Sequence, residues 1–342
     1  MTAVLREPAP GPAGPPVPGA GKGSLLRAEL HRFRARRFLQ VVLGLAPLAW
    51  LAAAVIGFSF FGVPTEADRA AAQQQREQFV AEENDYQEDC LDEMPAGASA
   101  EEWCGPEVRA ADYPVEDFLE TVPFRFASDG DIGAMAFAFG AAVLAFVAGA
   151  TWIGAEWSSR SLVALLFWVP RRLRVMGTKI AVLVLAAALF GLLAQVCWLA
   201  LAGLLQAVAG EGAGVTGRFW NELLGIQARG VLLVVLAALG GFGLANLVRN
   251  TGAALGIGFV YFAIVEPAVG IVAPSSQPWL LSNNVIALLV PGGHTVYMFD
   301  FSDYEEPTEY LIENLQAGLV LGIAVAAVAA IGVALFTRRD LH

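Results

Sequence analysis

The segment at residues 154–179 reads GAEWSSRSLVALLFWVPRRLRVMGTK. Its residue types and spacing are those of a segment that a soluble partner protein binds and displaces. A helix is expected over 159–168, where Leu162, Leu165 and Leu166 recur at three- and four-residue spacing and so share one face. A proline ends this helix, and the arginines after it suit lipid headgroups. The other interpretation is an amphipathic loop helix that lies on the membrane without a partner.

Three polar residues interrupt apolar stretches and are candidates for a translocation path. Glu266 is the most deeply placed acid, and intramembrane carboxylates usually face protein or water. It either contacts cargo or a cation, or it lies near the outer end of its span and reaches interfacial water. Gln195 and Asn246 either line the same path or make hydrogen bonds between helices.

Enzyme chemistry is not indicated. The glycine-rich stretch 19–24 lacks the phosphate-loop pattern, because Pro16 stands where a glycine is required and Gly23 follows Lys22 where Ser or Thr is required. The three histidines are scattered, and the G-x-S-x-G elbow of serine hydrolases does not occur. The sequence therefore predicts no catalytic residue, no metal site and no cofactor bound by this chain, and it does not indicate a nucleic-acid partner.

The elements around these residues are predicted to be membrane-spanning helices. The chain is 56% hydrophobic and 15% charged, and its apolar residues gather in runs of the roughly 20 residues that a spanning helix needs. Six such runs are expected at 38–62, 131–153, 180–208, 223–248, 252–272 and 315–336. The fold class is therefore predicted to be an all-α membrane protein with six transmembrane helices.

Charge is sorted between the two sides of the membrane. Basic residues gather in 24–37, 154–179 and 337–342, whereas 63–130 and 273–314 are acidic. Basic short connections stay cytoplasmic, so both termini are expected inside a bacterial-type plasma membrane.

The segments outside the spans have separate predictions. Residues 1–23 are expected to be a disordered cytoplasmic tail, 24–37 an interfacial amphipathic helix, and 337–342 a cytoplasmic tail. Residues 63–130 are expected to form a small, mostly helical extracellular insertion, and 273–314 an extracellular loop with short re-entrant or interfacial helices. Cys90 and Cys104 either form a disulfide in the oxidising exterior, worth about 3 kcal/mol, or stay free thiols.

The order of these parts resembles the ABC-2 family of transporter permeases, which are the membrane subunits of ATP-driven exporters. The family's inner segment follows the pattern GxEWxxGTLxxLLxxPxxRxxxxxxK. The residues that match it are Gly154, Glu156, Trp157, Ser161, Leu162, Leu165, Leu166, Pro170, Arg171, Arg172 and Lys179. The tail from Phe336 to Asp340 also fits, whereas Arg160 departs from the pattern, which prefers glycine there.

The resemblance implies a coupling helix that docks in a groove of a separate ATPase, which binds the ATP and Mg²⁺. It also implies two permease chains, as a homodimer or a close heterodimer, held among membrane lipids. The residues assigned to ATPase coupling are Glu156, Arg160, Leu162, Leu165, Leu166, Pro170 and Arg171. The alternative function is an envelope sensor or scaffold, whose extracellular part binds a peptide or cell-wall ligand without transport.

Overall fold

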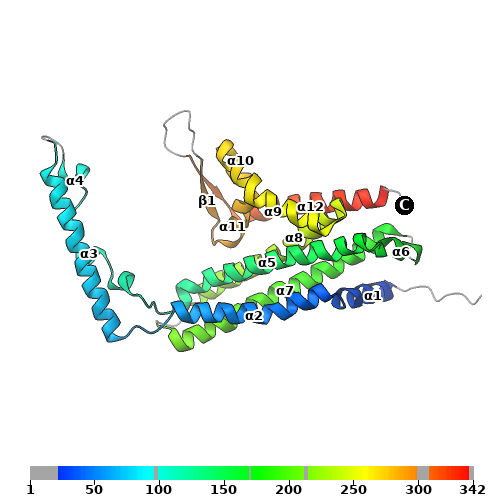
Figure 1. Cartoon of the computed structure of the whole chain (residues 1–342), viewed down its shortest axis with the longest axis horizontal. Coiled ribbons are helices and arrows are strands. Elements are labelled where there is room, and N and C mark those ends of the chain that lie inside the picture. Colours follow the sequence, from blue (N-terminus) through cyan, green and yellow to red (C-terminus); the bar gives the residue numbers. More distant parts are fainter. Residues whose placement is uncertain (1–21, 96–98, 169–170, 212–214, 299–307, 339–342) are drawn as a thin grey trace, which may run out of the picture.

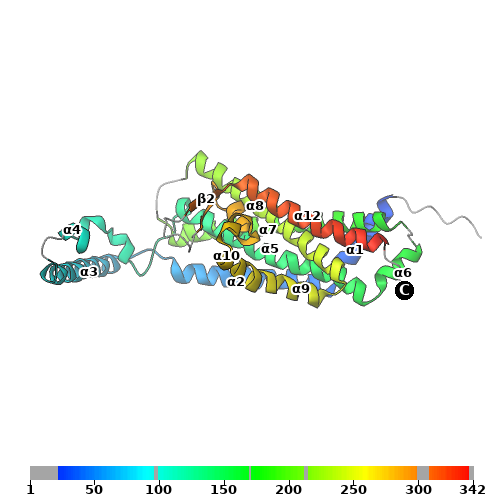
Figure 2. The ribbon, with the colours of Figure 1, turned by 90° about the horizontal axis from the view of Figure 1, so that it is seen from above.

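A computed structural model describes residues 22–95, 99–168, 171–211, 215–298 and 308–338. The predicted tails therefore lie mostly outside the described residues, as does Pro170. The long helices form an elongated bundle, and a thin helical arm projects from one of its ends (Figures 1 and 2). The described start of the chain, the end of its last helix and the predicted coupling helix all lie at the opposite end, which we call the α6 end (Figure 1).

The chain is a multi-pass membrane protein. Five helices are long and apolar enough to span a bilayer: α5 (Phe126–Ser158), α7 (Arg172–Ala209), α8 (Gly217–Val248), the run from α9 to α10 (Thr251–Val272), and α12 (Asn314–Arg338). The first predicted span corresponds to α2 (Arg37–Phe60), in which the apolar stretch Gly44–Phe60 is shorter. The sixth span therefore stays a prediction.

Two helices extend well beyond the predicted spans. The helix α5 has 33 residues and α7 has 38, so they are about 50 and 57 Å long at 1.5 Å per residue. A hydrocarbon core is only roughly 30 Å thick. The predicted connection at 154–179 is consequently mostly helical, and the part between α5 and α7 that holds α6 (Ser161–Trp168) is short.

Small residues set the distance between the central helices α5 and α8. A Cβ atom added to Gly149 would collide with the carbonyl oxygen of Ala238, and one added to Gly241 would collide with that of Phe146. The two backbones therefore lie against each other at two successive levels, as is common where membrane helices pack through small side chains. The largest buried apolar cluster surrounds this contact and includes Trp152, Leu183 and Phe242.

The stretch 273–314 contains short helices, as expected, and also a β-hairpin that was not expected. The 3₁₀ helix η4 (Pro274–Trp279) and the helix α11 (Leu281–Leu289) precede the antiparallel strands β1 (His294–Met298) and β2 (Thr308–Ile312), which pair from His294–Ile312 to Met298–Thr308. Gly293 has a φ of +107°, and a Cβ there would collide with the carbonyl oxygen of Ile312. Glycine thus permits the close start of the hairpin, within a stretch whose sequence resembles a loop.

The arm at the other end holds the long helix α3 (Glu66–Asp92), the short helix α4 (Ala100–Trp103), and the 3₁₀ helices η1 (Ala110–Asp112) and η2 (Val115–Phe118). Thr65 and Asp68 form a capping box at the start of α3, and hydrogen bonds from the backbone and hydroxyl of Thr65 lower the pKa of Asp68. Phe79 packs on Tyr113 and Phe118, and Arg69 pairs with Glu211 of the bundle at 2.8 Å.

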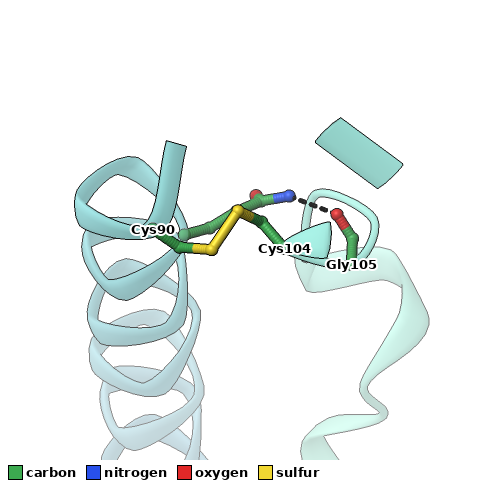
Figure 3. Close-up of a disulfide and its surroundings, with 4 residues drawn as sticks. Cys90, Cys104 and Gly105 are labelled. Carbon is green, nitrogen blue, oxygen red and sulfur yellow. Dashed lines mark hydrogen bonds between the residues drawn. A yellow bond between two sulfur atoms is a disulfide. The ribbon is translucent and has the colours of Figure 1, made fainter. Parts of the chain in front are cut away.

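The predicted disulfide is confirmed. Cys90 near the end of α3 is bonded to Cys104, which directly follows α4 (Figure 3). The side chain of Gln87 donates a hydrogen bond to the carbonyl oxygen of Gly105 at 2.7 Å, which adds a second tie between the same two segments. The far end of the arm is therefore closed covalently.

Replacing both cysteines, Cys90→Ser with Cys104→Ser, is expected to loosen the far end of the arm and leave the bundle unchanged. Loss of the cross-link costs about 3 kcal/mol, so amide exchange in α4 and the last turns of α3 should accelerate by about a hundredfold. Cys197→Ala is the matched control, since it removes the free thiol of α7. Unchanged exchange in the double variant would contradict the stabilising role of the disulfide.

Candidate functional site: the α6 end of the bundle

The helix α6 joins α5 to α7 at the tip of the bundle (Figures 1 and 2). Leu162 is 1% exposed and belongs to the central apolar cluster, Leu165 is buried, and Leu166 is half-buried against the same cluster. The three-leucine face, assigned from the sequence to a partner, therefore packs against the chain's own bundle. Phe167 is instead 85% exposed, and among the side chains of α6 that the structure describes it is the large apolar one turned outward.

Arg160 occupies a turn whose backbone conformation favours glycine. Its φ is +54°, in the left-handed region, and its N–H donates to the carbonyl oxygen of Trp157. This conformation costs a residue with a Cβ atom about 1 kcal/mol or more, whereas glycine adopts it freely. The arginine found here therefore holds the α5–α6 turn at a cost in stability.

Gly154, six residues before Arg160, permits a close helix contact. A Cβ atom at Gly154 would collide with the hydroxyl of Thr251, the first residue of α9. The side chain of Asn250 caps α9 by accepting the N–H of Ala253 at 2.9 Å. The glycine of the inner pattern is thus required by packing inside the chain.

Glu156 lies in a row of alternating charges whose centre is buried, which we call the charge row. It consists of Arg32, Glu29, Lys179, Glu156 and Arg36. The ammonium of Lys179 lies 2.7 Å from a carboxylate oxygen of Glu29 and 2.8 Å from one of Glu156. Arg36 reaches Glu156 at 2.8 Å, and Arg32 reaches Glu29 at 3.1 Å. The row therefore joins α1 (Lys22–Arg34), α5 and α7.

The centre of the charge row is shielded from water. The side chains of Lys179 and Glu29 are both 0% exposed, and the ammonium also lies 5.2 Å from the centre of the Trp152 ring. Two carboxylates and one ammonium leave an excess negative charge, which the outer arginines offset. Removing one member of such a buried pair typically costs about 3–5 kcal/mol, because the other charge stays behind without a partner.

Trp157, the next residue, ties α5 to the opposite side of the bundle. Its indole N–H donates to Asn246 of α8 at 3.0 Å, and its ring packs edge-on against Phe336 of α12. The guanidinium of Arg249 lies 4.7 Å from the centre of the same ring. Arg172 of α7 donates to the carbonyl oxygens of Phe336 and Thr337. Three helices, α5, α8 and α12, therefore meet at this indole, and α7 is tied to the end of α12 through Arg172.

The inner pattern is thus built mainly from residues that bind the chain to itself. Glu156 and Lys179 face α1, Trp157 faces α8 and α12, and Leu162 faces the core. Glu156, assigned from the sequence to ATPase coupling, lies too deep for direct contact with a partner. Arg160, Phe167 and Arg171 are among the described residues of this region with exposed side chains suited to that contact.

The three candidates for a translocation path all make contacts inside the chain. Asn246 accepts from Trp157, and Gln195 donates to the carbonyl oxygen of Ala134 at 3.2 Å. Glu266 is buried, and its two carboxylate oxygens accept the N–H groups of Leu281 and Ser282 at 2.6 and 3.0 Å. These contacts match the interhelical interpretation of Gln195 and Asn246, and they give Glu266 a structural role not foreseen from the sequence.

Glu266 is one of three side chains that hold the ends of α11. Its carboxylate meets the positive N-terminal end of that helix. Arg229 of α8 reaches the carbonyl oxygen of Leu289 at the other end at 3.5 Å, and the side chain of Asn314 donates to the carbonyl oxygens of Ala287 and Val290. The free backbone groups of a short helix within the bundle are thereby satisfied, as an apolar environment requires.

Comparisons with known proteins add no identification. No protein-family model matches the chain, and a search of curated proteins finds no match either. Sequence reasoning missed Glu29 and Arg36 as members of the site. A usable signal was present, because Glu29 is the single acid among the basic residues of 22–37 and Glu156 is the single acid between Asp131 and Glu211. A lone acid in such surroundings indicates an ion pair.

Arg160→Gly is expected to stabilise the α5–α6 turn by about 1 kcal/mol, because glycine tolerates the positive φ. Amide exchange of α6 should slow by about fivefold. Arg160→Ala removes the same charge and retains a Cβ, so it should give no such gain. Equal exchange in the two variants would show that the turn is not strained by its side chain.

Proposed function

We propose that this chain is the transmembrane permease subunit of an ABC-2 type exporter, driven by ATP that a separate ATPase subunit hydrolyses. The observation that carries the proposal is the placement of α6. It is a short helix held at the tip of two long helices, with its leucines turned inward and Phe167 turned outward. A rigidly attached helix of this kind transmits a rigid-body displacement to the spans behind it.

The positions of the basic residues and of the disulfide agree with an orientation in which the α6 end faces the cytoplasm. The basic residues around α1, the α5–α7 connection and the end of α12 gather at the α6 end, and the disulfide lies in the arm at the other end (Figure 1). Placing the α6 end in the cytoplasm satisfies the positive-inside rule and puts the disulfide in an oxidising exterior. The ATPase would then meet α6, Arg160 and Arg171 from the cytoplasm.

The working transporter would contain a second permease chain, as a homodimer or a close heterodimer, with the cargo path between the two copies. In this arrangement Gln195, Asn246 and Glu266 support the packing within each copy. This fits their contacts with Ala134, Trp157 and the start of α11. ATP and Mg²⁺ would bind to the ATPase.

The sensor or scaffold interpretation is favoured by one observation, the arm that projects from the bundle (Figures 1 and 2). An arm of this shape suits capture of a ligand outside the cell. A flux assay in vesicles separates the two functions, because an exporter moves cargo when ATP and the ATPase are supplied, whereas a sensor binds its ligand without flux.

Phe167→Ala is expected to reduce co-purification of the ATPase by about tenfold or more, since a large exposed aromatic at the centre of a small interface behaves as a hot spot. The experiment co-expresses the chain with an ABC ATPase subunit and measures the ATPase recovered per chain. Phe259→Ala is the matched control, because Phe259 is also a strongly exposed phenylalanine, 70% against 85%, but lies on the span α9. Undiminished recovery with Phe167→Ala would count against α6 as the docking helix.

A further inference from the structure

We propose that Glu29 and Lys179 are positioning residues for α6, because they join α1 to the ends of α5 and α7 that carry it. In this view the N-terminal helix and α6 respond to force as one unit. The inference deepens the proposed function and rests on it for what pushes α6. The link between α1 and α6, however, belongs to the chain alone and is measured without a partner.

The first step of the argument is that the charge row opens as a whole. Lys179 contacts both Glu29 and Glu156, and the ammonium and the Glu29 carboxylate are fully shielded from water. Separating Lys179 from Glu29 or from Glu156 leaves an unpaired charge in an environment of low polarity. This state is strongly unfavourable until water enters and solvates the charge. The row therefore has a closed, dry state and an open, hydrated state, and α1 is either docked or released.

The second step is the position of the row relative to α6. Glu156 lies on α5 two residues before that helix ends, and Lys179 lies in the second to third turn of α7. The ends of α5 and α7 are the two attachments of α6. Any contact that sets the spacing of Glu156 and Lys179 therefore sets the position of α6, and Glu29 of α1 is bonded to the same ammonium.

The third step is apolar packing that runs beside the charges. Phe33 of α1 packs edge-on against Trp152 of α5, with ring centres 4.7 Å apart. Leu162 of α6 and Met176 of α7 belong to the same buried cluster as these two rings. Release of α1 would thus remove packing as well as charge pairing from the region that supports α6.

The test is amide hydrogen exchange of the full chain in nanodiscs, followed by mass spectrometry and without any ATPase. Glu29→Gln should accelerate exchange in both 22–34 and 161–168 by about tenfold or more, because a buried charge that loses its partner strongly destabilises its surroundings. Arg34→Gln is the matched control, since Arg34 is an exposed cation of the same helix. It should leave both regions unchanged.

A variant of the charge row without its buried charges tests whether the effect of Glu29→Gln is local or comes from unfolding of the whole chain. The triple variant Glu29→Gln, Glu156→Gln and Lys179→Met removes the buried charges while it retains side chains of similar size, so exchange in α8 and α12 should stay slow. In Glu29→Gln, accelerated exchange in α1 and α6 together supports the proposal. Acceleration in α1 alone, or in neither helix, overturns it. If exchange of α1 and α6 accelerates together but recovery of the ATPase is unchanged in Phe167→Ala, α6 is not the docking helix and the positioning role of Glu29 and Lys179 is still supported.

Discussion

A buried ammonium held between two carboxylates is the constraint on which the α6 end depends. Lys179 could not be placed in the dry interior alone, and its position is tenable because Glu29 and Glu156 approach it from two other helices. The same requirement fixes α1, since an undocked α1 would leave Lys179 and Glu156 with an incomplete set of charges. Electrostatics thus adds to the packing of Phe33 in ordering a helix whose Leu26 and Leu30 are exposed.

The end of α5 is held from two sides by neighbouring residues with different chemistry. Glu156 uses charge toward α1 and α7, and Trp157 uses a hydrogen bond, ring packing and a stacked guanidinium toward α8 and α12. A helix end fixed in this way has little freedom to tilt alone. A displacement of α6 would therefore be shared among the helices that meet there, which is what the proposed transmission of force requires.

A further set of polar side chains serves a different need, which is to finish a short helix inside the bundle. The ends of α11 expose backbone groups that lipid cannot satisfy. Glu266, Arg229 and Asn314 supply these groups with partners from three other helices. Polar residues of apolar helices are often assigned to transport, but the partners of these three are backbone groups of the chain's own fold.

The sequence by itself determined the helical membrane class, most of the span positions and the location of α6, because each of these depends on local patterns of apolar or charged residues. It offered the Cys90–Cys104 disulfide as one of two alternatives, and the structure decided between them. Only the tertiary structure decided which way the leucines of α6 face, because the face that is buried depends on the neighbours that α5 and α7 bring to it. The hairpin β1–β2 was likewise invisible, since its close start depends on the approach of Ile312 to Gly293. The charge row unites residues 150 positions apart. Pairing over such a distance follows from how the helices pack, and no periodicity along the chain records it.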